Sequence, residues 1–409
     1  MVALPRGEGV ARCGARDSPS MTLLEAEARP LRLRTGVRSS VGVAAVLYFF
    51  MGLDNYIGNA GGPQPVKLIL VFIGIALIIV LSDVGRGQPL FRSPIVGWLA
   101  FYFLLTTAWG IFIKDDQRLI QTLTDRYRSM ALLSALLVLF AQPRVRQTGI
   151  TAVCLATIGI SILNIGELAG IFSFPAVPSP TPGRASGFFM NVNESAIAIV
   201  LGLAVSMRFV PSALRAPMLL VGLAGITATF SRGAFVCLAV LLLWLALRQH
   251  WVWSLALVAA GAVLVLAYAP ALLESAGWLN TDTAARLALT QDDSGRVDLA
   301  MKAWALFLRS PLIGNGIGAT IPWGEAGYAH NMYLTLAAEH GVLGLLAFPA
   351  LGFAIYASHR DGVGVALVLA VAGFFSHTLL EGTYALVTMA VVAAPVDQSA
   401  VHAPADQGA

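Results

Sequence analysis

Three arginines and one histidine stand out as side chains that could bind and activate a charged ligand. They are Arg184 in GRASGFFMNVNES, Arg232 in TFSRGAF, Arg296 in SGRVDLAMKAW and His330 in AHNMYL. A guanidinium is permanently charged and holds a phosphate through two parallel hydrogen bonds. A histidine with an unperturbed pKa of about 6.5 can take a proton from a hydroxyl at neutral pH. Together these residues predict a site for an anionic ligand, for which a diphosphate is the natural candidate.

Two further polar residues follow His330 and are expected to support it. Asn331 is its direct neighbour, and Glu339 comes between two and three helical turns later. At 1.5 Å per residue, the carboxylate lies about 12 Å along the predicted membrane helix. A charge at that depth is costly unless it is paired, so we expect Arg232 or Arg184 to be its partner.

The composition places these residues in a membrane protein. Of 409 residues, 57% are hydrophobic and 12% are charged, whereas soluble domains carry about 25% charged residues. Apolar runs of roughly 17 to 25 residues recur, each long enough to cross about 30 Å of hydrocarbon as a helix. The short alternation of a transmembrane β-barrel fits poorly. The net charge of +4 comes mainly from residues between the apolar runs and does not indicate nucleic-acid binding.

The predicted fold class is all-α, a polytopic membrane bundle of about twelve transmembrane helices with a large outer, periplasmic loop before the tenth. The fourth and twelfth segments are the shortest. The apolar runs place these helices at about 40–57, 66–83, 93–113, 128–141, 149–172, 193–210, 213–230, 232–248, 251–270, 331–357, 362–379 and 382–395.

Charge bias between the helices predicts their orientation. With a cytoplasmic N-terminus every inner loop is basic, as the positive-inside rule expects. One outer segment, 114–127, argues the other way because it holds Lys114, Arg118 and Arg126. The residues that make the predicted inner loops basic are Arg86, Arg92, Arg144, Arg146, Arg208, Arg215, Arg248, His359 and Arg360.

The chain is expected to consist of an Arg-rich cytoplasmic tail (1–39), a membrane domain (40–395) and a polar cytoplasmic tail (396–409). Met21 is an alternative start. The membrane domain includes an outer loop at 271–330. On this topology the three arginines and His330 all lie at the outer face, where positive-inside bias makes arginines unexpected.

The outer loop is expected to contain an amphipathic helix at 296–308. Arg296 would lie in its first turn, where free backbone N–H groups favour an anion; a simple tether between membrane helices is the alternative. The glycines that follow, in SPLIGNGIGAT, indicate a flexible turn. The apolar face comprises Val297, Ala300, Met301, Trp304, Phe307 and Leu308.

Several chemistries find no support in the sequence. The glycine-rich turn lacks the strand-turn-helix context of a dinucleotide site, and no GxxxxGK[ST] phosphate loop occurs. No Ser-His-Asp or Cys-His signature is visible. Only six histidines occur, and no acidic cluster joins them. The expected site therefore uses neither metal nor cofactor.

At these residues the chain resembles the O-antigen ligase and O-antigen polymerase superfamily of membrane glycosyltransferases. The resemblance covers most of the chain. The short twelfth helix and the Arg-rich leader depart from the family's pattern. The motifs that carry the resemblance, in the family's order, are GRASGFFMNVNESAIAI, TFSRGAF, GRVDLAMKAWALFLRSPLIGNGIG and AHNMYLTLAAEHGVLG.

The resemblance implies an activity at the outer face of a bacterial inner (cytoplasmic) membrane. A glycan would move from an undecaprenyl-diphosphate carrier to an acceptor hydroxyl, without metal. Arg184, Arg232 and Arg296 would hold the diphosphate and stabilise the charge that builds on it. His330 would act as general base or orient the acceptor, and direct displacement would invert the anomeric carbon.

The sequence is compatible with several classes of acceptor. A ligase uses lipid A core and a polymerase uses a second lipid-linked glycan; the single large loop before the histidine helix favours the ligase. An exopolysaccharide or capsule polymerase, or a ligase that acts on protein, would use the same residues. A secondary transporter or flippase is the alternative from another class, and it would place its ionisable residues near the bilayer midplane.

Overall fold

The computed structural model describes residues 36–82, 93–111, 117–177, 183–249, 295–321 and 329–395. Helices are the only regular elements in these ranges, which confirms the all-helical prediction. Helices lie near most of the expected positions there, but the one expected at 40–57 is broken between Phe50 and Leu53, the one expected at 128–141 begins earlier and the one expected at 362–379 ends earlier. The predicted helix at 251–270, most of the outer loop at 271–330, most of the Arg-rich tail and the polar tail at 396–409 lie outside the described residues.

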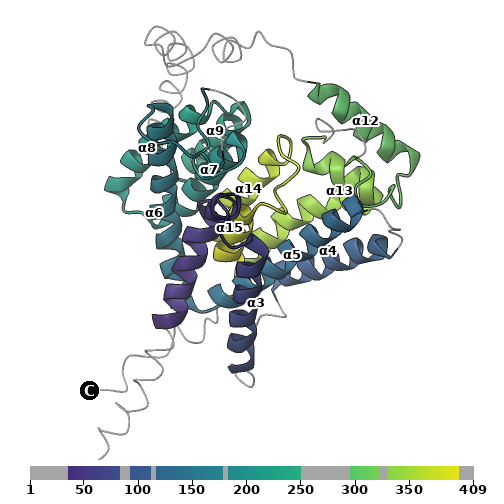
Figure 1. Cartoon of the computed structure of the whole chain (residues 1–409), viewed down its shortest axis with the longest axis horizontal. Coiled ribbons are helices and arrows are strands. Elements are labelled where there is room, and N and C mark those ends of the chain that lie inside the picture. Colours follow the sequence, from purple (N-terminus) through teal and green to yellow (C-terminus); the bar gives the residue numbers. More distant parts are fainter. Residues whose placement is uncertain are drawn as a thin grey trace, which may run out of the picture.

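The chain begins its described part with a helix at Gly36–Phe50, whose last turn is π-helical. Figure 1 shows the helices gathered into a single bundle, with α12 at its edge. The elements in chain order are η1 (Val46–Phe50), α2 (Leu53–Asn59), α3 (Pro65–Ser82), α4 (Pro94–Gly110), α5 (Gln117–Phe140), α6 (Pro143–Leu168), α7 (Val192–Phe209), α8 (Ser212–Thr229), α9 (Arg232–Gln249), α12 (Arg296–Arg309), α13 (Met332–Ser358), η4 (Arg360–Gly362), α14 (Val363–Ala372) and α15 (Thr383–Ala393).

Several of these helices can cross a membrane. By length and hydropathy four described helices qualify, namely α6, α7, α8 and α13. A fifth span results if Gly36–Phe50 and α2, which meet at a bend of 67°, count as one. The chain is therefore a helical membrane protein, while the count of twelve spans stays a prediction.

Helix α5 differs from its predicted extent. It begins at Gln117, so the expected outer segment 114–127 is largely helical and Arg126 is buried inside the bundle. Gln121 Nε2 donates to Asp125, which also pairs with Arg128. Such pairs three and four residues apart stabilise a helix. Hydropathy alone missed these turns because their exposed face is polar.

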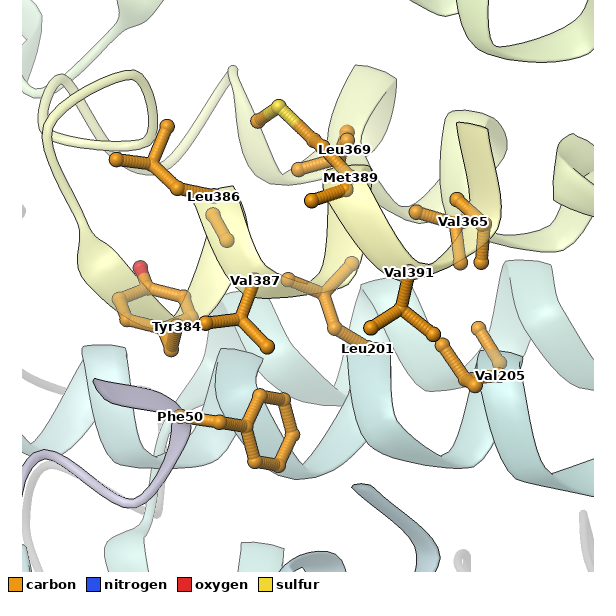
Figure 2. Close-up of a cluster of buried hydrophobic side chains, with 14 of the residues drawn as sticks. Phe50, Leu201, Val205, Val365, Leu369, Tyr384, Leu386, Val387, Met389 and Val391 are labelled. Carbon is orange, nitrogen blue, oxygen red and sulfur yellow. The ribbon is translucent and has the colours of Figure 1, made fainter. Parts of the chain in front are cut away.

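The core is built around α15, which lies at the centre of the bundle (Figure 1). Every residue of this helix from Tyr384 to Ala393 is buried. Figure 2 shows Val387 and Val391 facing Leu201 and Val205 of α7. The sequence TYALVTMAVVA has no polar face, as expected for a helix covered by protein on all sides.

One end of the bundle collects helix ends that the charge bias assigns to the cytoplasm. Arg146, near the start of α6, donates from Nε to Val391 O at 2.8 Å, at the end of α15. Arg208, near the end of α7, pairs with Asp361 at 2.5 Å. The predicted inner ends thus lie together, and which side of the membrane they face stays a prediction.

Helix α13 contains a break that the glycine-rich turn fills. Gly341 has φ 64° and ψ −147° inside the helix, which leaves nearby backbone groups without helical partners. Asn315 N donates to Ala338 O at 2.9 Å and Gly316 N to Glu339 O at 3.0 Å, while Val342 N donates to a carbonyl of the same turn. The turn expected to be flexible is therefore bonded to α13.

Replacing Gly314 with alanine is expected to destabilise the fold strongly. Gly314 has φ +80°, and a Cβ there would meet Glu339 O at 2.2 Å. A left-handed alanine costs about 1–2 kcal/mol, and overpacking adds about 1–3 kcal/mol. The measurement is the thermal unfolding midpoint of the purified protein in detergent.

Gly61 provides the matched control for this substitution. It has φ +83°, and a Cβ there meets nothing within 4 Å. Gly61→Ala should therefore show the left-handed cost alone. Equal losses in the two variants would contradict the packing role of Gly314.

Candidate active site

The four residues expected to carry chemistry come from separate elements. Arg184 precedes α7, Arg232 is the first residue of α9, Arg296 is the first residue of α12, and His330 lies two residues before α13. The contacts of each residue show how far the fold brings them together.

Arg184 holds the turn that carries Arg232. Its Nε donates to Thr229 O at 2.7 Å and its Nη2 donates to Phe230 O at 3.2 Å. These carbonyls close α8, where Phe230 has φ 50°. Orphan carbonyls at a helix end need such donors. Arg184 thus fixes the α8–α9 turn, and its binding of a diphosphate stays a prediction.

The segment that carries Arg184 is anchored by Glu167 near the end of α6. Glu167 Oε2 accepts from Ser186 N at 2.8 Å and from Gly187 N at 2.7 Å. Two backbone donors compensate a carboxylate that would otherwise be costly near the membrane. Glu167 therefore has a positioning role.

Arg232 is exposed at the start of α9. Ser231, immediately before it, donates from Oγ to Asn193 Oδ1 at 2.8 Å, which ties this turn to the first turn of α7. The free N–H groups at the start of a helix favour an anion. An exposed guanidinium at the same place adds a permanent positive charge.

His330 is held in a strained conformation beside a second histidine. Its φ is 46°, a left-handed value that costs a non-glycine residue on the order of 1 kcal/mol or more and that clusters at functional sites. Its ring packs edge-on against His377, with centroids 5.1 Å apart. Burial, and then the charge of Arg296, lower the pKa of His330. Arg296 is therefore electrostatically coupled to His330.

Asn331 serves as the N-cap of α13. Its Oδ1 accepts from Leu334 N at 3.1 Å, which satisfies one of the free N–H groups at the helix start. The cap fixes the chain immediately after His330. A role of Asn331 in supporting the chemistry of His330 stays a prediction.

Glu339 is paired, but with Arg126 rather than with Arg232 or Arg184. The Arg126 Nη2 to Glu339 Oε2 distance is 2.5 Å, and the side chains are 5% and 2% exposed. Gly318 N donates to the other carboxylate oxygen at 2.8 Å. Arg126 also lies near Glu381, with Nε 3.6 Å from Oε1. The expected partner was wrong because Arg126 was assigned to an outer segment.

A loop between α14 and α15 completes this end of the bundle. Helix α14 ends at Ala372 instead of near 379, so His377 lies in the loop and not in a helix. Met332 N donates to Gly373 O at 2.7 Å, which binds the loop to the start of α13. Thr378 Oγ1 donates to Glu194 Oε1 at 3.1 Å.

Glu194 and His377 were not selected from the sequence. An acidic residue in the first turn of a predicted membrane helix was the available signal for Glu194. The position of His377 in a loop could not be predicted, because the run 362–379 is apolar throughout and does not mark the end of α14. Among the described residues, no three His, Cys, Asp or Glu side chains group as metal ligands.

Part of the chain matches a known protein family. The model of the family described as O-antigen ligase matches residues 217–349. The matched segment contains Arg232, Arg296, His330, Asn331 and Glu339. No curated protein matches the chain. Residues 217–349 are therefore similar to the O-antigen ligase family, which confirms the resemblance to the O-antigen ligase and polymerase superfamily.

Proposed function

We propose that the protein is a membrane glycosyltransferase of the O-antigen ligase type. It transfers a glycan from an undecaprenyl-diphosphate carrier to a hydroxyl of lipid A core, at the outer face of the inner membrane. One observation carries the proposal. An exposed arginine at the start of α9 and a histidine coupled to a second arginine at the start of α12 both fall within the family match.

The geometry supports a division of roles between charge and base. Arg232 and Arg296 start two helices, where guanidinium and backbone N–H groups together suit a diphosphate. The acceptor oxygen attacks the anomeric carbon while the bond from that carbon to the phosphate oxygen breaks. The arginines stabilise the charge that remains on the diphosphate. His330 takes the proton of the acceptor hydroxyl, and the anomeric configuration inverts.

In the pH profile of the transfer rate, the decrease on the acid side, or acid limb, is expected to lie below pH 6.5. A base works in its deprotonated form, and the lowered pKa of His330 keeps the ring neutral to lower pH than an ordinary histidine. His377 does not compete for the proton near neutrality, because burial lowers its pKa to about 4. The measurement is kcat/KM of the purified enzyme against pH.

Arg296→Gln tests the cause of this shift. Removal of the neighbouring positive charge raises the pKa of His330, so the acid limb of the residual activity should move to higher pH. Arg309→Gln, at the other end of α12, is the matched control and should leave the profile in place. A limb that stays fixed in Arg296→Gln would contradict the electrostatic coupling of Arg296 to the titrating base.

A transporter remains the alternative because one ion-pair network lies inside the bundle. Arg126 is buried between Glu339 and Glu381, and intramembrane charges often mark transport pathways. Here, however, the Glu339 carboxylate is fully engaged by Arg126 and Gly318. This pairing is what a structural role requires, whereas the residues at the bundle end are those that suit a transferase.

The test is transfer by the purified protein in detergent without added metal. Undecaprenyl-diphosphate glycan is supplied with lipid A core in one reaction and with a second lipid-linked glycan in another. Product on lipid A core supports the ligase. Lengthened lipid-linked glycan identifies a polymerase, and no product with either acceptor overturns the proposal in favour of another acceptor or of transport.

A further inference from the structure

Glu194 lies in the first turn of α7 but does not cap that helix. It is the third residue of α7, and a glutamate there commonly bonds back to the backbone N–H of the N-cap residue. In this helix the N-cap is Asn191, whose side chain accepts from Asn193 N at 2.8 Å. The Glu194 carboxylate instead reaches another segment and accepts from Thr378 Oγ1 at 3.1 Å.

The residues next to Glu194 contact the turn that carries Arg232 and the loop that packs against His330. Asn193, immediately before it, accepts from Ser231, which precedes Arg232. Thr378, its own partner, follows the histidine that packs against His330. Glu194 is also partly exposed. Glu194 is therefore connected through one neighbouring residue on each side to the turn before Arg232 and to the loop that carries His377.

Other carboxylates of the bundle already have partners. Asp54, which interacts electrostatically with Glu194, accepts from Thr383 Oγ1 at 3.0 Å. Glu167 accepts from two backbone N–H groups, and Glu381 lies beside Arg126. Within the described residues, Thr378 makes the one hydrogen bond to the Glu194 side chain. An ionised carboxylate offers about four acceptor positions, so most of its capacity is left for a ligand.

We propose that Glu194, with Thr378 beside it, binds a hydroxyl of the acceptor sugar. The inference rests on the proposed function and extends it from the donor to the second substrate. Guanidinium groups only donate hydrogen bonds, so the arginines suit the diphosphate, and His330 serves the attacking hydroxyl; the other hydroxyls of the acceptor sugar still need a group that accepts their hydrogen bonds. A carboxylate is such a group. Its negative charge also disfavours binding of the diphosphate on this side.

The test compares Glu194→Gln with the wild type in the purified transfer reaction. Glutamine keeps an oxygen for Thr378 and removes the charge, so the fold is preserved. The expected result is a KM for the acceptor glycan raised by about tenfold to a hundredfold, the range for loss of a hydrogen bond to a charged group. The donor KM should stay unchanged. Glu194→Asp should recover part of the loss.

A second readout uses undecaprenyl diphosphate itself as the binding probe. Its affinity should be unchanged in Glu194→Gln and weakened in Arg232→Ala. Asp361→Asn, which removes a carboxylate at the opposite end of the bundle, should leave both readouts at wild-type values. An unchanged acceptor KM in Glu194→Gln, or probe binding lost as in Arg232→Ala, overturns this inference alone. A wild-type protein that transfers to no acceptor overturns the proposed function instead.

Discussion

Arg232→Ala is expected to abolish detectable transfer while the protein still inserts and folds. Arg232 is exposed at the start of α9, so its truncation removes charge without opening the core. Loss of one group that stabilises transition-state charge costs roughly 10²- to 10³-fold in rate. The measurement is glycan transfer per folded molecule, with folding followed by the thermal unfolding midpoint in detergent.

Arg248→Ala is the matched control on the same helix. Arg248 lies in the last turn of α9, near Trp244, and is expected at the cytoplasmic side. Its removal should leave transfer unchanged. Normal glycan output from Arg232→Ala would remove α9 from the site.

His330→Ala should abolish transfer in the same assay, since loss of a general base costs roughly 10²- to 10⁴-fold. The left-handed backbone at φ 46° complicates an alanine, so His330→Asn is the informative companion. Asparagine tolerates this conformation but is no base. Activity in His330→Asn would show that the imidazole is dispensable.

Glu339→Ala is the substitution expected to destabilise the protein most. It leaves the buried Arg126 guanidinium without its closest partner and Gly318 N without its acceptor. Breaking a buried ion pair from one side costs about 3–5 kcal/mol. Because Glu381 lies 3.6 Å from Arg126 and still compensates its charge, the loss of unfolding free energy should be near the lower end of this range. The measurement is the unfolding midpoint and the yield from membranes.

The double variant Arg126→Leu with Glu339→Met separates pairing from packing. Removal of both charges leaves no uncompensated ion, and such replacements are often neutral or stabilising. The double variant should therefore be more stable than Glu339→Ala. If its glycan transfer also persists, the pair is structural, whereas complete loss of function in a stable double variant would favour the transport alternative.

The positions of most helices could be predicted because apolar runs of membrane length are separated by basic or glycine-containing loops. The start of α5 could not, because its first turns carry Gln121 and Asp125 on a polar face. With that helix misplaced, Arg126 could not be recognised as the partner of Glu339. Buried pairing between residues 213 positions apart is set by packing and has no local signature.

The candidate site residues were proposed from the sequence for a different reason. Arginines at helix starts are unexpected on the outer side, so Arg232 and Arg296 stand out from the background of charge. The loop between α14 and α15 places Thr378 against Glu194 and His377 against His330. Their roles depend on tertiary contacts that composition and spacing do not encode.

The central position of α15 also bears on how the chain is assembled during synthesis. This helix is the last of the described elements to leave the ribosome, yet it fills the middle of the bundle. Its 11 residues reach about 16 Å at 1.5 Å per residue, too little to be released into lipid as a span of its own. We expect the earlier helices to leave an unfilled seam until α15 packs there, so a translation product that stops before Thr383 should be more susceptible to membrane proteases.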